Sequence, residues 1–252
     1  MARRGGDKLF SKTKELKKQD FKREKENKNK VPDVIIACED EVSAPTYFKM
    51  LVAKLIENKL ITQNSFVIAT HHKNHPTGVL EDLKNHKSNN GKKYKDFEHK
   101  WIVIDRDIQR VNGGGHKKED FNNAIIGAKQ SNVEVAYAND SFELWYLLHF
   151  DYRDTSILRD EILEKVIEKL KARNSHKFTK LDDENIKQEN YTKLIFDELL
   201  ELQETAIKNA QRLLASYGNS HNPENDNPST TVHKLVQILN GFKIEMNDIQ
   251  KK

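Results

Sequence analysis

The stretch Asp33-Val-Ile-Ile-Ala-Cys-Glu39 decides the fold class of this chain. It is a short apolar run rich in β-branched residues, which is typical of a strand buried on both faces. Similar runs occupy residues 65–70, 101–105 and 133–138. Segments with helical spacing of apolar residues follow the four runs, at roughly 45–58, 77–87, 119–130 and 141–150. This alternation predicts an α/β fold with a mostly parallel sheet and helices on both faces.

The remainder of the chain has a different pattern. From residue 154 onward we predict helices only, at roughly 155–172, 190–216 and 229–240, with a polar loop over 222–228. The sequence therefore predicts three regions: a basic arm over 1–30, an α/β domain over 31–152 and an α-helical region over 153–252.

The positive charge is concentrated in the arm. The chain has 43 Lys and Arg against 39 Asp and Glu, yet residues 1–30 alone carry a net charge of +7, which leaves −3 for the rest. With so few large apolar groups, the arm is expected to be disordered or a frayed helix. Two interpretations stay open: the arm attracts nucleic-acid phosphates in a salt-sensitive way, or it is a solvated leader.

Several protein classes are excluded by the sequence. No apolar run approaches the roughly 18 residues that a membrane span needs, and no apolar segment follows the basic N-terminus. The single cysteine, Cys38, excludes an internal disulfide and a cysteine-based zinc cluster, and its place in a buried strand predicts a core residue. Neither glycine-rich nucleotide-binding pattern is present. We therefore expect a soluble, cytoplasmic protein.

Acidic residues follow three of the predicted strands. The first strand ends in Glu39-Asp40-Glu41, the third in Asp105-Arg106-Asp107, and the fourth leads to Asp140 and Glu143. Parallel strands present their carboxyl ends at one edge of the sheet, where α/β proteins place their chemistry. Carboxylates gathered there repel one another unless a cation lies between them, and oxygen ligands suit Mg²⁺ or Mn²⁺. Such a site can activate water and stabilise a leaving phosphate oxygen.

Structural explanations remain open for each candidate. Asp140 and Glu143 also fit a helix-start signature, in which Glu143 would bond backbone amides. His149 lies in an apolar helix, where it is either a structural hydrogen bonder or part of a site. The histidines that follow the second strand are ligands or exposed loop residues: His71, His72 and His75.

Three stretches resemble the RloB family. Residues 35–48 (IIACEDEVSAPTYF) resemble its opening motif, residues 101–107 (WIVIDRD) its "DrD" strand, and residues 136–150 (AYANDSFELWYLLHF) its most specific segment. Shorter signatures around 191–193, 206–213 and 227–231 follow in the same order. The resemblance spans roughly residues 34–239, so chance is a poor explanation.

The resemblance implies a Toprim-like fold, a bacterial defence role and a partner. RloB proteins are similar to Toprim nucleases and occur in abortive-infection loci, beside restriction–modification genes or an ABC-type ATPase. The metal-binding positions of Toprim nucleases fall on Glu39, Asp105 and Asp107. The first motif departs from the family pattern: Asp40, Val42 and Ala44 stand where the family has Gly, Lys and Glu.

We therefore expect a Mg²⁺- or Mn²⁺-dependent nuclease component of an anti-phage system. Glu143 would be a further metal ligand, and Glu41 and His149 are additional site candidates. Tyr191 and Lys193 would approach the phosphates of the nucleic acid. The alternative is a non-catalytic subunit that binds nucleic acid or a partner and works with an ABC-type ATPase. Neither interpretation involves a membrane. The sequence does not distinguish a DNA substrate from an RNA substrate, and it does not indicate an oligomeric state.

Overall fold

The computed structural model describes residues 33–58, 65–88, 91–111 and 113–250, with side chains up to residue 241. Residues Asp33–Lys252 form one unit. The predicted basic arm over 1–30 lies outside the described residues. The predicted boundary at 152/153 falls within this unit and stays a prediction.

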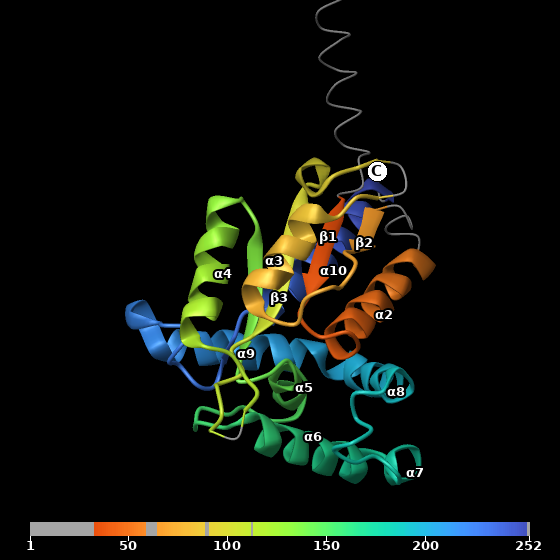
Figure 1. The fold of residues 1–252 in the computed structure, drawn as a ribbon. Helices are drawn as coiled ribbons and strands as arrows, with labels where there is room; N and C mark the ends of the chain where they lie inside the picture. The colour runs from red at the N-terminus through yellow and green to blue at the C-terminus, as the bar shows by residue number, and fades with distance from the viewer. Residues whose placement is uncertain (1–32, 59–64, 89–90, 112, 251–252) are drawn as a thin grey trace, which may run out of the picture. The chain divides into compact units, whose positions relative to one another are not determined.

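A five-stranded sheet organises this unit (Figure 1). The strand order is β2-β1-β3-β4-β5, and the first four strands in that order run parallel. Their bounds are Val34–Cys38 for β1, Phe66–Ile68 for β2, His99–Asp105 for β3, Glu134–Asn139 for β4 and Ser229–Thr230 for β5. The predicted α/β class with a mostly parallel sheet is therefore confirmed.

Two helices cover one face of the sheet. α3 spans Pro76–Asn85 and α4 spans Lys118–Gln130, and both lie in front of the strands in Figure 1. Alternate strand residues face them, including Ile35, Ile102 and Tyr137, because successive side chains of a strand point to opposite faces. The resulting apolar core fixes the sheet edge from which the site is built.

The other helices near the sheet join the α/β part to the C-terminal half. α2 (Ser43–Glu57) contacts β2 and α8 (Glu189–Leu199), and α5 (Glu143–Phe150) packs on α6 (Arg159–Arg173) and α9 (Gln203–Tyr217). The ring of Tyr47 in α2 lies edge-on to Trp145 of α5 and to Phe196 of α8. This aromatic contact fixes the start of α5, and with it Glu143, beside α2.

The C-terminal half is mainly helical, as predicted, with two differences. The helix expected over 190–216 is divided into α8 and α9 by a short 3-10 turn at Leu200–Leu202. The prediction of helices only is wrong at Ser229–Thr230, which pair with β4 in the antiparallel direction. The Thr230 hydroxyl donates to the Tyr137 carbonyl at 2.7 Å, and Tyr137 N–H donates to Thr231 Oγ1 at 3.0 Å. These hydroxyl bonds extend a strand pairing that two residues alone would hardly support.

Two further helices belong to the unit. α7 covers Ser175–Phe178, and α10 covers Val232–Gln250 and contacts β4 and α9. Within the described residues, no helix is both long and apolar enough to cross a membrane.

Candidate metal centre

The structure brings Glu39 and Asp105 together at the carboxyl end of the sheet. β1 and β3 are neighbouring parallel strands, and the ladder continues one step beyond β1, because Glu39 N–H donates to the Val103 carbonyl at 3.0 Å. The Glu39 side chain then turns back over the end of β3, and Asp105 N–H donates to Glu39 Oε2 at 3.0 Å. The expectation that these two acidic residues lie close together is met.

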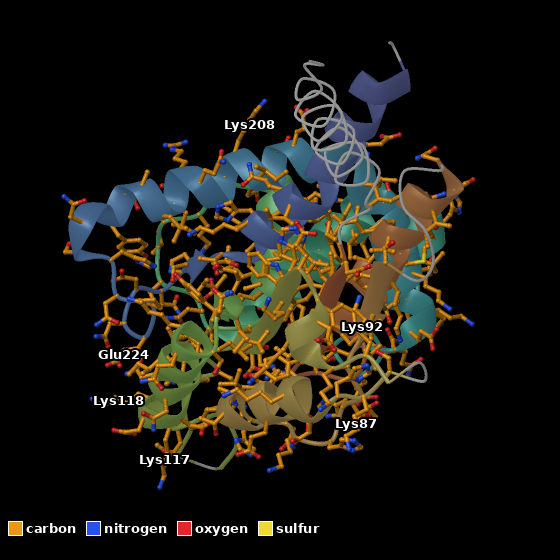
Figure 2. All side chains as sticks on the ribbon, turned by 90° about the horizontal axis from the view of Figure 1, so that it is seen from above. Lys87, Lys92, Lys117, Lys118, Lys208 and Glu224 are labelled. Carbon is orange, nitrogen blue, oxygen red and sulfur yellow. The ribbon has the colours of Figure 1, made fainter. Side chains whose placement is uncertain are left out.

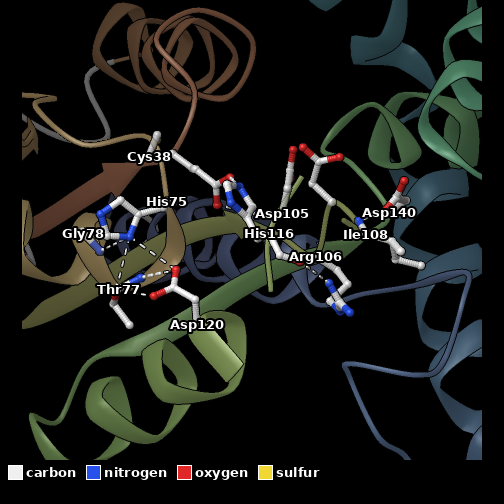
Figure 3. Close-up of polar contacts among 12 residues, drawn as sticks. Cys38, His75, Thr77, Gly78, Asp105, Arg106, Ile108, His116, Asp120 and Asp140 are labelled. Carbon is white, nitrogen blue, oxygen red and sulfur yellow. Dashed lines mark hydrogen bonds and ion pairs between the residues drawn. The ribbon is translucent and has the colours of Figure 1, made fainter. Parts of the chain in front are cut away.

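A histidine that the sequence did not single out holds the other Glu39 oxygen. His116 Nε2 lies 2.5 Å from Glu39 Oε1, and both side chains are largely buried. Figure 3 shows His116 and Asp105 close together beside Arg106. Burial opposes protonation of His116, but the hydrogen bond and charge of Glu39 outweigh it and raise the pKa of the imidazole. His116 is therefore a hydrogen-bonding partner of the Glu39 carboxylate.

The conformation of the loop from 107 to 116 places His116 beside Glu39. His116 N–H donates to the Asp107 carbonyl at 2.6 Å, and Arg106 NH1 donates to the His116 carbonyl at 3.2 Å. Gly115 has φ +73°, and a Cβ there would meet the Ile108 and Asp107 carbonyl oxygens at 2.5 and 2.6 Å. Only glycine allows this approach, so Gly115 has a specific structural role in the loop.

Asp107 faces cations. Its Oδ2 accepts from Arg159 NH1 at 2.9 Å, and its Oδ1 lies 3.3 Å from Arg110 NH1 without hydrogen-bond alignment. The residue is buried and has φ +32°, which a residue with a Cβ seldom adopts. The pKa of the Glu39 carboxyl is raised, first by burial and also by the negative charge of Asp107. Asp107 thus lies near the predicted centre, in an ion pair with Arg159.

Asp140 positions both members of that ion pair. Its Oδ1 accepts from Ile108 N–H at 2.7 Å, and Figure 3 shows these two residues side by side. Its Oδ2 accepts from Arg159 N–H at 3.1 Å, and its backbone carbonyl accepts from Asp107 N–H at 2.9 Å. One side chain therefore joins the end of β4, the loop after β3 and the start of α6. The predicted alternative of a helix-start box does not describe these contacts.

Glu143 is completely buried at the start of α5. Its Oε1 accepts from Ser43 Oγ and from Lys187 Nζ, both at 3.0 Å, and its Oε2 has no hydrogen-bond partner. Burial opposes its ionisation, but the charges of Lys187 and Arg159 outweigh this and lower the pKa of Glu143. A buried carboxylate oxygen without a partner is costly, so it marks a position where a ligand would be stabilising.

Asp40 has a structural role. Its carboxylate accepts from the backbone N–H groups of Val42, Ser43 and Ala44, which begin α2. Burial, and then the charge of Glu143, raise its pKa. Asp40 therefore caps a helix N-terminus, where a negative charge is favourable.

The acidic residues at this edge oppose one another's ionisation. The pKa of Asp105 is raised well above its ordinary value by burial first, then by Glu39 and Glu143, against the opposing charge of Lys187. The described residues contain no group of three or more His, Cys, Asp or Glu side chains already arranged to hold a metal ion. Donor chemistry nevertheless fits a hard cation, because oxygen atoms predominate and Glu143 Oε2 is unpartnered. We call Glu39, Asp105, Asp107 and Glu143 the acidic edge.

A family model described as "RloB-like protein" matches residues 34–239, which is most of the chain. The chain belongs to the RloB-like family. No curated protein and no solved structure matches it. The family resemblance seen in the sequence is therefore confirmed, and the acidic edge lies within the matched region.

The remaining predicted site residues of this RloB-like chain lie apart from the acidic edge or have structural partners. Glu41 is exposed and lies 3.6 Å from His71 Nε2. His149 is buried, with Nδ1 2.7 Å from the Trp145 carbonyl, and burial lowers its pKa to about 4. These contacts support the structural interpretation of His149. Tyr191 and Lys193 lie in α8, where Lys193 Nζ pairs with Glu189 at 2.6 Å.

The other histidines and Cys38 also have structural surroundings. His75 accepts from Gly78 N–H at 3.3 Å and so caps α3, and Asp120 of α4 lies beside it (Figure 3). His71 Nδ1 lies 3.2 Å from the Cys38 carbonyl. Burial raises the pKa of the Cys38 thiol, in agreement with a core residue.

Four basic residues of the site were missed by sequence reasoning: Arg110, His116, Arg159 and Lys187. Arg159 and Lys187 come from segments far along the chain, and their contacts depend on how α5, α6 and α8 pack. For His116 a local signal existed, since it directly follows three glycines. A run of glycines before a titratable residue can bring it back against the preceding strand.

A pocket of about 640 Å³ lies between α2 and β2. Its lining includes Asp40, Lys49 and His71 together with apolar side chains such as Ile56 and Phe66. No residue of the acidic edge lines this pocket.

Proposed function

We propose that this RloB-like protein is a Mg²⁺- or Mn²⁺-dependent, Toprim-like nuclease that acts in the cytoplasm as part of an anti-phage, abortive-infection system. The observation that carries the enzymatic part is the hydrogen bond from Asp105 N–H to Glu39 Oε2. It holds the Glu39 carboxylate over the carboxyl end of the neighbouring parallel strand β3, next to Asp105, whose pKa is raised by burial and by its acidic neighbours. The defence role rests on family resemblance.

In this proposal Glu39 and Asp105 hold the metal, with Glu143 as a further ligand and Asp107 as a fourth carboxylate within reach. When bound, the metal would supply a nucleophilic water and stabilise the leaving phosphate oxygen. His116 orients the Glu39 carboxylate through its Nε2 contact, as partners of metal-ligating carboxylates commonly do. Arg106 in turn orients His116 by donating to its backbone carbonyl.

Cations around the acidic edge support a nucleic-acid substrate. Arg110, Arg159 and Lys187 contact its carboxylates, and each has a partly exposed side chain. Lys117 and Lys118 directly follow His116 and point outward at the start of α4 (Figure 2). Basic groups beside a metal centre are suited to the phosphates on either side of a scissile bond. Tyr191 and Lys193 are proposed as more distant backbone contacts.

One observation favours a non-catalytic alternative. Glu39 is already paired with His116, and Asp107 with Arg159, so two of the expected ligands are neutralised without a metal. In this second proposal the protein binds nucleic acid or a partner, and catalysis belongs to an ABC-type ATPase encoded alongside it.

Cleavage of labelled DNA and RNA in the presence of Mn²⁺ or EDTA separates the two proposals. We expect cleavage with Mn²⁺, none with EDTA, and none for Glu39→Gln. Glu57→Gln is the matched control, because Glu57 is an exposed residue at the end of α2 whose partner is Lys54. Salt-sensitive binding by the wild type without cleavage in any metal would favour the non-catalytic subunit.

A further inference from the structure

Arg159 has an unusual place at the acidic edge. Its NH1 donates to Asp107 Oδ2 at 2.9 Å, yet 25% of its side chain is exposed, against 8% for Asp107. Among the contacts of the described side chains, the Asp107 bond is the only hydrogen bond of this guanidinium. A guanidinium has five N–H donors in a planar fork that fits phosphate oxygens as well as carboxylate oxygens. Arg159 therefore has donors to spare on a side that solvent reaches.

The ion pair is held in place by a built structure. Asp140 binds the backbone N–H groups of both Ile108 and Arg159, and it accepts from Asp107 N–H through its own carbonyl. The backbones that carry Asp107 and Arg159 are thus tied to one residue at the end of β4. A chance surface pair would lack such support, and its side chains would lose more conformational entropy on pairing.

The same contact withdraws an oxygen that a metal would need. Asp107 Oδ2 is engaged by Arg159, while Asp107 Oδ1 and Glu143 Oε2 are buried without hydrogen-bond partners. A positive guanidinium and a divalent cation cannot occupy the same side of one carboxylate without strong repulsion. Arg159 and the metal therefore compete for Asp107.

We propose that Arg159 is the phosphate-binding residue of the acidic edge and exchanges its Asp107 partner for a phosphate group of the nucleic acid. The exchange leaves Asp107 free to join the metal ligands only when substrate is present. This inference rests on the proposed metal-dependent function, and it assigns to the C-terminal half, through α6, a direct part in the site. It also accounts for the absence of a ready-made metal cluster among the described residues.

Calorimetric titration of Mn²⁺ without nucleic acid tests the competition. We expect Arg159→Gln to bind Mn²⁺ roughly tenfold more tightly than the wild type, the order of one charge-assisted hydrogen bond. Arg173→Gln is the matched control, since Arg173 lies in the same helix and donates to Glu198 at 2.8 Å. Arg110→Gln removes an equal charge beside Asp107 but no hydrogen bond, so it should tighten Mn²⁺ binding less. Equal tightening by Arg110→Gln and Arg159→Gln would overturn the specific competition.

Binding of labelled single-stranded DNA and RNA in EDTA tests the phosphate role. Arg159→Gln should bind more weakly, with a log–log salt slope lower by up to about 0.7, while Arg173→Gln should match the wild type. Unchanged affinity for both nucleic acids would overturn the assignment. If Arg159→Gln does not fold, Arg159→Lys keeps the charge without the fork, and nucleic-acid binding equal to that of the wild type would then overturn the assignment. If the wild type binds Mn²⁺ and Arg159→Gln binds it no more tightly, only this inference is refuted. If neither protein binds Mn²⁺, the metal-dependent function itself is refuted.

Discussion

Replacing Gly115 by alanine tests how the loop after β3 delivers His116 to Glu39. The backbone has φ +73° at this position, and the added Cβ would lie 2.5 Å from the Ile108 carbonyl oxygen and 2.6 Å from that of Asp107. A residue with a Cβ costs about 1–2 kcal/mol in this conformation. The backbone and side-chain shifts that would relieve this overlap destabilise the fold by roughly a further 1–3 kcal/mol. We therefore expect Gly115→Ala to lower the free energy of unfolding by about 3 kcal/mol.

Gly113→Ala is the matched control. Gly113 has φ +95° in the same loop, but a Cβ there would have no atom within 4 Å. Gly113→Ala should therefore lower the free energy of unfolding only by the cost of the backbone conformation, about 1–2 kcal/mol. For a unit of this size, about 1 kcal/mol shifts the melting temperature by roughly 2–4 °C. The two variants should therefore differ clearly in thermal melting followed by circular dichroism.

The same variants have a second readout at His116. In metal-free buffer, NMR titration of the wild type should give His116 a raised pKa because Glu39 stabilises the charged ring. Gly115→Ala displaces the ring and should lower that pKa towards its ordinary value of about 6.5, whereas Gly113→Ala should keep it raised. Equal melting temperatures and equal His116 titrations in the two variants would refute the close-approach argument.

Three further predictions follow from other parts of the chain. Asp40→Asn keeps an acceptor for the first N–H groups of α2, so it should be more stable in urea than Asp40→Ala by about 1 kcal/mol; equal stability would exclude the capping role. Burial lowers the pKa of His149 to about 4, so the unfolded chain takes up the proton first. The stability that this neutral ring contributes is present above about pH 6.5 and declines by up to about 3 kcal/mol towards pH 4. His149→Gln should flatten the dependence of unfolding free energy on pH, in part only, since His233 also titrates at about 4. Deletion of residues 1–30 should weaken nucleic-acid binding and flatten its salt dependence; an unchanged slope would leave the arm a solvated leader.

The sheet could be predicted from the sequence because its strands carry a local signal. The four apolar, β-branched runs sit in β1 to β4, and the acidic residues that follow β1 and β3 meet because parallel neighbours end at the same edge. β5 could not be predicted, since Ser229 and Thr230 form no apolar run and their pairing depends on threonine hydroxyls and the position of β4.

The site was only partly predictable for a related reason. Glu39 and Asp105 follow from strand order, but the partners of each carboxylate come from tertiary packing. Arg159 reaches Asp107 across 52 residues, and Lys187 reaches Glu143 across 44. The role of Asp40 as the cap of α2 likewise shows only in its contacts. Such partners are fixed by the path of the loops and by helix packing, which a single sequence does not encode locally.

Thermal melting of the wild type and Asp105→Asn, each with and without Mn²⁺, tests the central claim most directly. Asparagine keeps the shape of the side chain and removes the charge that burial and the neighbouring carboxylates oppose. Without metal the variant should therefore melt at the same temperature or higher. At about 100 times the dissociation constant, Mn²⁺ should stabilise the wild type by roughly 2.7 kcal/mol, and this gain should shrink in the variant together with loss of cleavage. A variant that is destabilised in both conditions, with an unchanged response to Mn²⁺, would contradict the metal site at Asp105.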